Sequence, residues 1–189
     1  MFIQTEKTPN PETLKFIPGR PILKSGTAEF KTEEDAADAP LAQSLFKIGG
    51  VRSVFFATDF LSVTREEDED WDLLKTHIMA VLMDHFTAGL PIVNDMAPAE
   101  GLTSAGREDE TEIEKQIREL IEQRVQPAVA MDGGHIEFHE FDADSGVVYL
   151  EMKGACSGCP SASMTLKAGI ENMLKHFIPE VTAVEPVEF

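Results

Sequence analysis

The chain holds two cysteines, Cys156 and Cys159, which lie close together in the segment "KGACSGCPSAS". Small residues surround both thiols, and Pro160 directly follows the second one. Two thiols at this spacing can bind a metal or cycle between thiol and disulfide, whereas one pair cannot form the disulfide framework of a small secreted domain. The sequence therefore predicts metal-binding or redox chemistry at this pair.

The pair lies between an expected strand that ends near Lys153 and the start of an expected helix. Backbone N–H groups and the helix dipole favour the thiolate at such a position, so we expect the pKa of both thiols to be lowered. Gly154, Ala155, Ser157 and Gly158 are small and allow unusual backbone angles. We therefore expect uncovered sulfurs on a surface loop, with room for a bulky cluster.

The elements that must position the pair form a predicted domain of residues 111–189. Thr111 and Glu114 fit a capping box at the start of an amphipathic helix. Alternating apolar residues then predict two strands, and a second helix follows the cysteines until Pro179. The order is α-β-β-[CxxC]-α-β, with expected strands at 135–141, 146–152 and 181–187 and the second helix at 161–177.

A second small domain is predicted over residues 1–88. Gly49 and Gly50 end a short helix, and Thr58–Asp59 joins two β-branched and aromatic runs in an expected hairpin. The expected elements cover residues 2–7, 13–18, 28–31, 40–47, 51–65 and 70–88. Residues 89–110 are rich in Ala, Pro, Gly, Ser and acid, which indicates a flexible linker. The predicted fold class is α+β, with two small α/β domains and helices packed on a small sheet in the second.

The composition restricts the partners. The chain has 16 Lys+Arg against 34 Asp+Glu, a formal net charge of −18, which repels phosphate backbones and anionic lipid surfaces. No segment approaches the roughly 18 apolar residues of a membrane span, and the first residues lack a targeting pattern. We therefore expect no nucleic acid and no membrane as partners. We also expect a cytoplasmic, bacterial location, with the mature form of an organellar protein as the alternative.

Two single-chain interpretations of the cysteine pair are disfavoured. The first is a thiol–disulfide oxidoreductase of the thioredoxin type. In this chain an expected β-hairpin precedes the CxxC pair and a proline follows the second cysteine, and neither feature fits that type. In a mononuclear zinc site, His135 and His139 would have to join the cysteines, but four residues along a strand separate them by about 13 Å. The oxidoreductase remains an alternative, as does a zinc ion that bridges two chains.

Ligand counting favours a shared site. The common [2Fe–2S] and [4Fe–4S] clusters take four thiolates, and each chain supplies two. A two-fold axis between the loops of two subunits would bring four cysteines together. Bridging zinc satisfies the same count, so the count alone does not name the metal.

The motifs of the whole chain resemble those of one family. Residues 124–138, "RVQPAVAMDGGHIEF", and residues 146–187, with "GACSGCPS" and "TLKAGIENML", closely resemble the NifU-like C-terminal domain of Nfu iron–sulfur proteins. Residues 1–88, with "IQTEKTPNPETLKFIPG" and "GVRSVFFATDFLSVTR", resemble the Nfu N-terminal domain. The chain departs from many relatives at His135, where they have aspartate after Asp-Gly-Gly.

The resemblance implies a carrier and not an enzyme. Members of the family assemble or receive a [4Fe–4S] cluster that is bridged between two subunits, and they pass it to apo-proteins. By this resemblance Cys156 and Cys159 bind the cluster, a [2Fe–2S] form being an alternative, and the loaded form is a homodimer. Its partners would be apo iron–sulfur client proteins and an upstream assembly scaffold. For the Asp132-Gly133-Gly134 segment we expect a helix-to-strand turn and no direct ligand role.

Overall fold

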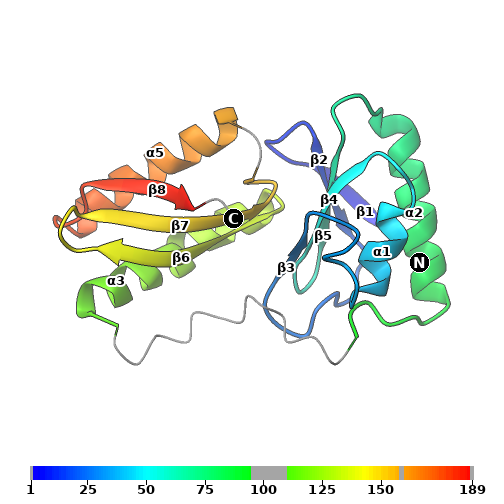
Figure 1. The fold of residues 1–189 in the computed structure, drawn as a ribbon, viewed down its shortest axis with the longest axis horizontal. Coiled ribbons are helices and arrows are strands. Elements are labelled where there is room, and N and C mark those ends of the chain that lie inside the picture. The colour runs from blue at the N-terminus through cyan, green and yellow to red at the C-terminus, as the bar shows by residue number, and fades with distance from the viewer. Residues whose placement is uncertain (1, 95–109, 158–159, 188–189) are drawn as a thin grey trace. The chain divides into compact units, whose positions relative to one another are not determined.

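The computed structural model describes residues 2–94, 110–157 and 160–187 of the chain. The chain divides into two compact units, residues 1–102 and 103–189, each with its own hydrophobic core. Each unit combines helices with one sheet (Figure 1), which confirms the predicted α+β class. Among the described residues, no helix is both long enough and apolar enough to cross a membrane.

The first unit is an antiparallel sheet of five strands in the order β1-β2-β5-β4-β3. Two helices cover one face of this sheet (Figure 1). The elements are β1 (Gln4–Lys7), β2 (Thr13–Ile17), β3 (Ala28–Phe30), α1 (Pro40–Phe46), β4 (Val51–Phe56), β5 (Leu61–Arg65) and α2 (Trp71–Thr87). They match the predicted elements in type and order.

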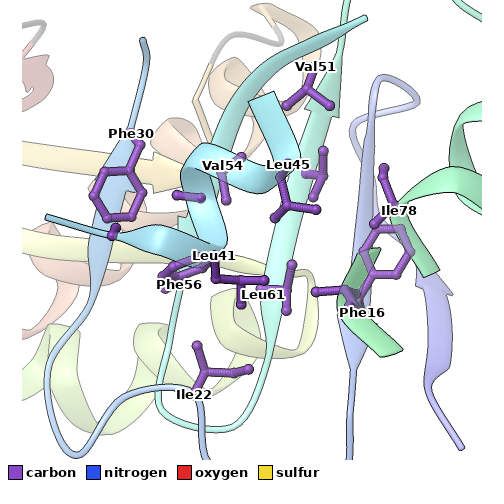
Figure 2. Packing of buried hydrophobic residues seen from close by; sticks show 14 of the residues in the cluster. Phe16, Ile22, Phe30, Leu41, Leu45, Val51, Val54, Phe56, Leu61 and Ile78 are labelled. Atoms are coloured by element: carbon purple, nitrogen blue, oxygen red, sulfur yellow. The ribbon is translucent and has the colours of Figure 1, made fainter. Parts of the chain in front are cut away.

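The core of this unit lies between the sheet and the helices (Figure 2). Phe56 pairs with Leu61 across neighbouring strands, so both side chains share the helix-facing side of the sheet. Phe16 extends this apolar surface along β2, and Ile78 of α2 is fully buried in the same core. Alternating apolar residues therefore decide which face of the sheet the helices cover.

Local signals set the ends of these elements, and the hairpin and the glycine pair are the predicted ones. The N–H of Ala57 donates to the carbonyl oxygen of Phe60 at 2.9 Å and closes the expected hairpin. Gly49 and Gly50 have φ of 75° and 76°, left-handed values that suit glycine, and they end α1. Asp70 caps α2, because its side chain accepts the N–H of Asp72 at 2.8 Å.

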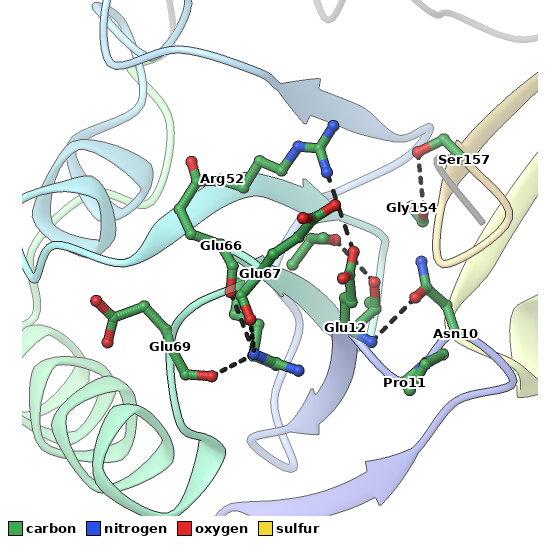
Figure 3. Close-up of polar contacts among 12 residues, drawn as sticks. Asn10, Pro11, Glu12, Arg52, Glu66, Glu67, Glu69, Gly154 and Ser157 are labelled. Atoms are coloured by element: carbon green, nitrogen blue, oxygen red, sulfur yellow. Dashed lines mark hydrogen bonds and ion pairs between the residues drawn. The ribbon is translucent and has the colours of Figure 1, made fainter.

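The acidic segment before α2, residues 66–70, folds back on Arg65, and Figure 3 labels three of its glutamates. Nη1 of Arg65 donates to the carbonyl oxygens of Glu66 and Glu67 at 3.2 and 3.0 Å, and also to that of Glu69. The indole N–H of Trp71, the first residue of the helix, donates to the carbonyl oxygen of Pro11 at 3.0 Å. These contacts fix the path of the acidic residues into α2.

The predicted linker, residues 89–110, falls mostly on residues 95–109, which lie outside the described residues. The residues just before them contact the first unit. The N–H of Asn94 donates to the carbonyl oxygen of Asp38 at 2.8 Å, and Ile92 packs against the first core. At the other end, Glu110 accepts from Arg118 of the second unit at 2.7 Å. The boundaries of the linker stay a prediction, and these contacts favour a start later than residue 89.

The second unit has three strands in the order β6-β7-β8. Its elements are α3 (Glu112–Leu120), η1 (Ile121–Val125), α4 (Gln126–Met131), β6 (Gly134–Asp142), β7 (Val147–Gly154), α5 (Pro160–Phe177) and β8 (Ala183–Val187). The order of helices and strands around the cysteines is the predicted one. β6 and β7 form an antiparallel hairpin, whereas β8 pairs in parallel with β7, a pairing that the sequence did not predict.

The second core lies on the helix side of this sheet. Val148 and Leu150 of β7 are fully buried, and they pack in one cluster with Ile117 of α3 and with Ile170 and Leu174 of α5. The residues between them on β7 belong to the opposite face, because successive residues of a strand alternate. The sheet therefore has an inner face, which belongs to the core, and an outer face. The cysteine segment, residues 153–163, begins at the end of β7.

The first helix of this unit contains a π-helical turn, η1, between α3 and α4. Pro127 is the second residue after this turn, and its ring lacks the N–H that an α-helix would use. A wider turn of this kind accommodates the missing donor and rotates the next part of the helix about the helix axis. The predicted capping box is confirmed at the start, where Thr111 and Glu114 bond to each other's backbone N–H.

Gly146 lies in the turn of the β6–β7 hairpin and contacts the chain just before the last strand. It has φ of 72°, and its carbonyl oxygen accepts the N–H of Thr182 at 2.7 Å just before β8. A Cβ atom at this position would lie 2.5 Å from the carbonyl oxygen of Glu180. The chain entering β8 therefore packs directly on the backbone of Gly146.

Candidate functional site

The cysteine segment leaves the sheet where β7 ends. Gly154, the last residue of the strand, has φ of 66°, which suits glycine. The N–H and the hydroxyl of Ser157 both donate to the carbonyl oxygen of Gly154, at 3.0 and 2.9 Å (Figure 3). A tight turn thus forms around Cys156, between strand and helix as predicted. Gly158 and Cys159 lie outside the described residues.

The thiol of Cys156 packs inward. The residue is 8% exposed and belongs to the second hydrophobic core. A Cβ atom on Gly134 would lie 2.5 Å from Sγ of Cys156, closer than real Cβ atoms come to a neighbour, so the sulfur occupies the space that a glycine leaves open. Gly134 and Ile136 share a strand face, and Ile136 is buried in the core. The sulfur therefore lies on the inner side of the sheet, at its end.

This environment keeps the thiol protonated. Burial raises the pKa of Cys156 to about 12, and the negative charge of Asp132 adds to the increase. The expectation of an uncovered sulfur with a lowered pKa is therefore wrong for Cys156. The small residues beside Cys156, which suggested an exposed loop, instead let the thiol approach the backbone at Gly134.

The Asp-Gly-Gly segment forms the predicted helix-to-strand turn. Gly133 has φ of 77°, and its N–H donates to the carbonyl oxygen of Ala130 at 3.1 Å. Its carbonyl oxygen accepts the N–H of Ala155 at 3.2 Å, so this turn is bonded directly to the cysteine segment. Sequence reasoning missed the close contact of Gly134 with the sulfur. Two consecutive glycines were the available signal, because one of them meets the turn's backbone angle and the other provides space.

Charged groups gather on the outer face near the same end of the sheet. Nζ of Lys153 lies 3.2 Å from Glu151 and 3.5 Å from Glu137, and Lys153 pairs with His135 across the strands. Burial lowers the pKa of His135 to about 4, and the positive charge of Lys153 contributes further. The imidazole is therefore neutral at physiological pH, although Glu151 opposes the shift.

Two further observations bear on metal binding. Among residues 2–94, 110–157 and 160–187, no group of three or more His, Cys, Asp or Glu residues could hold a metal ion. In the first unit, His77 is exposed, and His85 is buried with Nε2 3.0 Å from the carbonyl oxygen of Pro91. A complete ligand set for a metal would need groups beyond the described residues, such as Cys159 or a second chain.

Comparison with known proteins supplies two family matches. Residues 3–89 match the model described as "Scaffold protein Nfu/NifU N terminal", and residues 117–185 match the "NifU-like domain". A solution structure of a NifU-like protein from Saccharomyces cerevisiae covers 50% of this chain and 86% of its own, with 25% identity and a TM-score of 0.46.

Curated relatives align along nearly the whole chain. NifU-like protein 4, mitochondrial, of Arabidopsis thaliana is 50% identical over 185 residues, which is 98% of this chain and 65% of that protein. The human NFU1 iron-sulfur cluster scaffold homolog, mitochondrial, is 48% identical over 188 residues, which is 99% of this chain and 72% of that protein. The chain thus spans about two thirds of the length of these relatives.

Proposed function

Because the chain belongs to the Nfu family of iron–sulfur cluster scaffold proteins, we propose that it carries a cluster and delivers it to apo-proteins. Cys156 and Cys159 are the proposed ligands. The observation that carries this assignment is the position of Cys156 in a tight turn between β7 and α5, within the matched NifU-like domain. The cluster is the cargo of this protein, and thiolates are the ligands that such clusters take.

The proposed cargo is a [4Fe–4S] cluster shared by two copies of the chain. One chain supplies two thiolates, and a cluster of this type takes four, so a second copy completes the set. A [2Fe–2S] cluster satisfies the same count. The net charge of −18 on each chain opposes pairing in the absence of a cluster, so loading and dimerisation should be one equilibrium.

Loading requires a change at Cys156. The thiol of the cluster-free chain is buried, whereas a thiolate that binds a shared cluster must face a second chain. Metal binding also displaces the thiol proton, since the thiolate and not the thiol is the ligand. The buried, neutral thiol therefore fits a resting state, and a site with two ligands from each chain can release its cargo when the subunits separate.

The partners are set by this chemistry. They are a second copy, a donor of assembled clusters and apo-proteins whose own thiolates replace those of the carrier. The Arabidopsis and human relatives carry the word mitochondrial in their names, which favours the organellar alternative. The cytoplasmic, bacterial location receives no support from them.

Anaerobic reconstitution with iron and sulfide tests the proposal. We expect about four iron and four sulfide per two chains, with light scattering showing a shift from monomer to dimer on loading. A colourless dimer that contains zinc would favour the zinc-bridged alternative. A pair that cycles between thiol and disulfide without binding iron would favour the oxidoreductase. One full cluster on a strictly monomeric chain would contradict the shared site.

A further inference from the structure

Gln126 is the first residue of α4, directly after the π-helical turn, and both ends of its side-chain amide are engaged. Oε1 accepts the N–H of Ile136 at 3.0 Å, and Nε2 lies 2.6 Å from Nδ1 of His135. An N–H of Ile136 can only donate, so the amide orientation is fixed by this bond. Nδ1 of His135 must then accept, which places the proton of the neutral imidazole on Nε2.

These two bonds join the beginning of α4 to the strand that comes after the same helix. Between the bonded residues lie only the rest of α4 and the Asp132-Gly133-Gly134 turn. Among the described residues, β6 is an edge strand of its sheet, so the N–H of Ile136 that faces Gln126 has no strand beside it there. The side chain of Gln126 therefore links the start of α4 to the start of β6. These bonds hold the Asp132-Gly133-Gly134 turn against the helix.

The cysteine segment is seated on this same turn. The carbonyl oxygen of Gly133 accepts the N–H of Ala155, and Gly134 provides the space in which Sγ of Cys156 lies. Gly134 immediately precedes the two residues that Gln126 binds. Displacement of the start of β6 would thus move the wall of the space that the thiol occupies.

The π-helical turn explains how a helix residue reaches the strand edge. A residue inserted into a helical turn rotates the rest of the helix by roughly 100°, the angle between successive residues of a helix of 3.6 residues per turn. Gln123 lies within the π-helical turn and is exposed, whereas Gln126 comes after it and contacts β6. Gln123 therefore lies inside the π-helical turn, and Gln126 lies beyond it.

We propose that Gln126 is a positioning residue for Cys156, which holds Gly134 in place so that the thiol stays packed inward until a cluster is loaded. The inference deepens the proposed function, because it assigns a residue that controls one of the proposed ligands. The π-helical turn has a role in this arrangement, since it directs Gln126 to the edge of β6. Loss of the amide bonds frees the turn, and the thiol then leaves its buried position more often.

Alkylation of Cys156 in the full-length chain tests the proposal without a cluster. In a Cys159→Ser background, the rate of reaction with iodoacetamide is followed by mass spectrometry at one fixed pH. We expect Gln126→Ala to raise the rate about fivefold or more, the size expected from losing one or two hydrogen bonds. Gln123→Ala is the matched control and should react at the parent rate. Gln126→Glu keeps an acceptor for Ile136, and His135 can donate to the new carboxylate from Nδ1 by changing its tautomer, so we expect a rate close to that of the parent.

A second variant keeps the test independent of helix stability. Gly134→Ala places a methyl group on the sulfur's position, so its alkylation rate should exceed that of Gln126→Ala. Circular dichroism and thermal unfolding show whether each variant is folded at the assay temperature. Equal rates in Gln126→Ala and Gln123→Ala, with both proteins folded, would overturn the proposal. Because no iron is present, that outcome would leave the proposed carrier function untouched, and failure of reconstitution would likewise leave the alkylation result standing.

Discussion

The two faces of the second unit's sheet differ most at the end where the cysteine segment begins. On the inner face, Cys156 packs against Gly134 as part of the hydrophobic core, and its thiol is neutral. On the outer face, a lysine lies between two glutamates beside His135. The proposed ligand is thus kept on the apolar side, and the sheet separates it from the charges of Lys153, Glu137 and Glu151. Cluster loading must therefore change the surroundings of the thiol as well as its protonation.

Removal of the inner-face thiol should have the largest effect. We expect Cys156→Ala to reduce bound iron and sulfide to background after anaerobic reconstitution, because a four-thiolate site would keep only two of its ligands. The loss of one buried sulfur atom should lower the free energy of unfolding by only about 1 kcal/mol. Iron and sulfide assays, with urea unfolding as the control for folding, check both parts. Full loading of the variant would contradict the assignment of Cys156.

Truncation of the inner face away from the thiol should affect stability and not ligation. Leu150 is fully buried in the second core, so we expect Leu150→Ala to lower the free energy of unfolding by about 3 kcal/mol. Iron bound per folded chain should be unchanged. Urea unfolding of the cluster-free chain, followed by a probe of the second unit, measures the first quantity. A cost below about 1 kcal/mol would mean that this face is not a tightly packed core.

Disruption of the outer face should have a moderate effect. Lys153→Met removes the positive charge between Glu137 and Glu151 and leaves two carboxylates close together. We expect a loss of about 2 kcal/mol in the free energy of unfolding, because charges that lose their partner in a partly buried site are costly. The triple variant with Glu137→Gln and Glu151→Gln should regain most of this loss. If Lys153→Met were as stable as the parent, the outer-face ion pairs would be energetically neutral.

The smallest expected effect is a dependence of stability on pH. Because burial lowers the pKa of His135 from 6.5 to about 4, both the folded and the unfolded chain hold a neutral imidazole above pH 6.5. Between pH 6.5 and 4 the unfolded chain binds a proton that the folded chain does not, so stability falls as the pH is lowered. The full shift corresponds to at most about 3 kcal/mol, and because the His135 side chain is only partly buried we expect a loss of about 1 to 2 kcal/mol. The difference in unfolding free energy between the parent and His135→Gln should shrink over this range, and a constant difference would show that His135 does not titrate in this way.

Most of the fold could be predicted because its signals are local. The Thr111 capping box, the glycine pair after α1 and the alternating apolar residues of the hairpins each act within a few residues of one another. The parallel pairing of β8 with β7 could not be found in this way, since the long crossover through α5 separates the paired residues. The π-helical turn was also not predicted, because the apolar spacing from Ile113 to Val125 fits one continuous amphipathic helix.

The sequence indicated which residues form the site, but it did not indicate that the side chain of Cys156 is buried. The spacing of Cys156 and Cys159 indicated a ligand pair, but the direction of the Cys156 side chain depends on Gly134, which lies 22 positions earlier in the sequence. Small residues beside a cysteine are compatible with an exposed sulfur and equally with one that packs on a neighbouring backbone. Tertiary packing decided between these two outcomes, and it also placed Gln126 beside the turn.

The contact at Gly146 has a consequence for the order in which the second unit folds. The β6–β7 hairpin pairs residues that are near in sequence, so its closure has a low entropic cost and can occur early. β8 can join only after α5 has brought Thr182 back to the carbonyl oxygen of Gly146, more than thirty residues away along the chain. We therefore expect docking of β8 onto the hairpin to be the slow, non-local step of folding, with Gly146 as the point at which the register of the parallel pair is set. The cysteine segment lies at the start of this crossover, where Cys156 packs on Gly134 of the hairpin itself, so we expect this proposed ligand to reach its buried position before β8 docks.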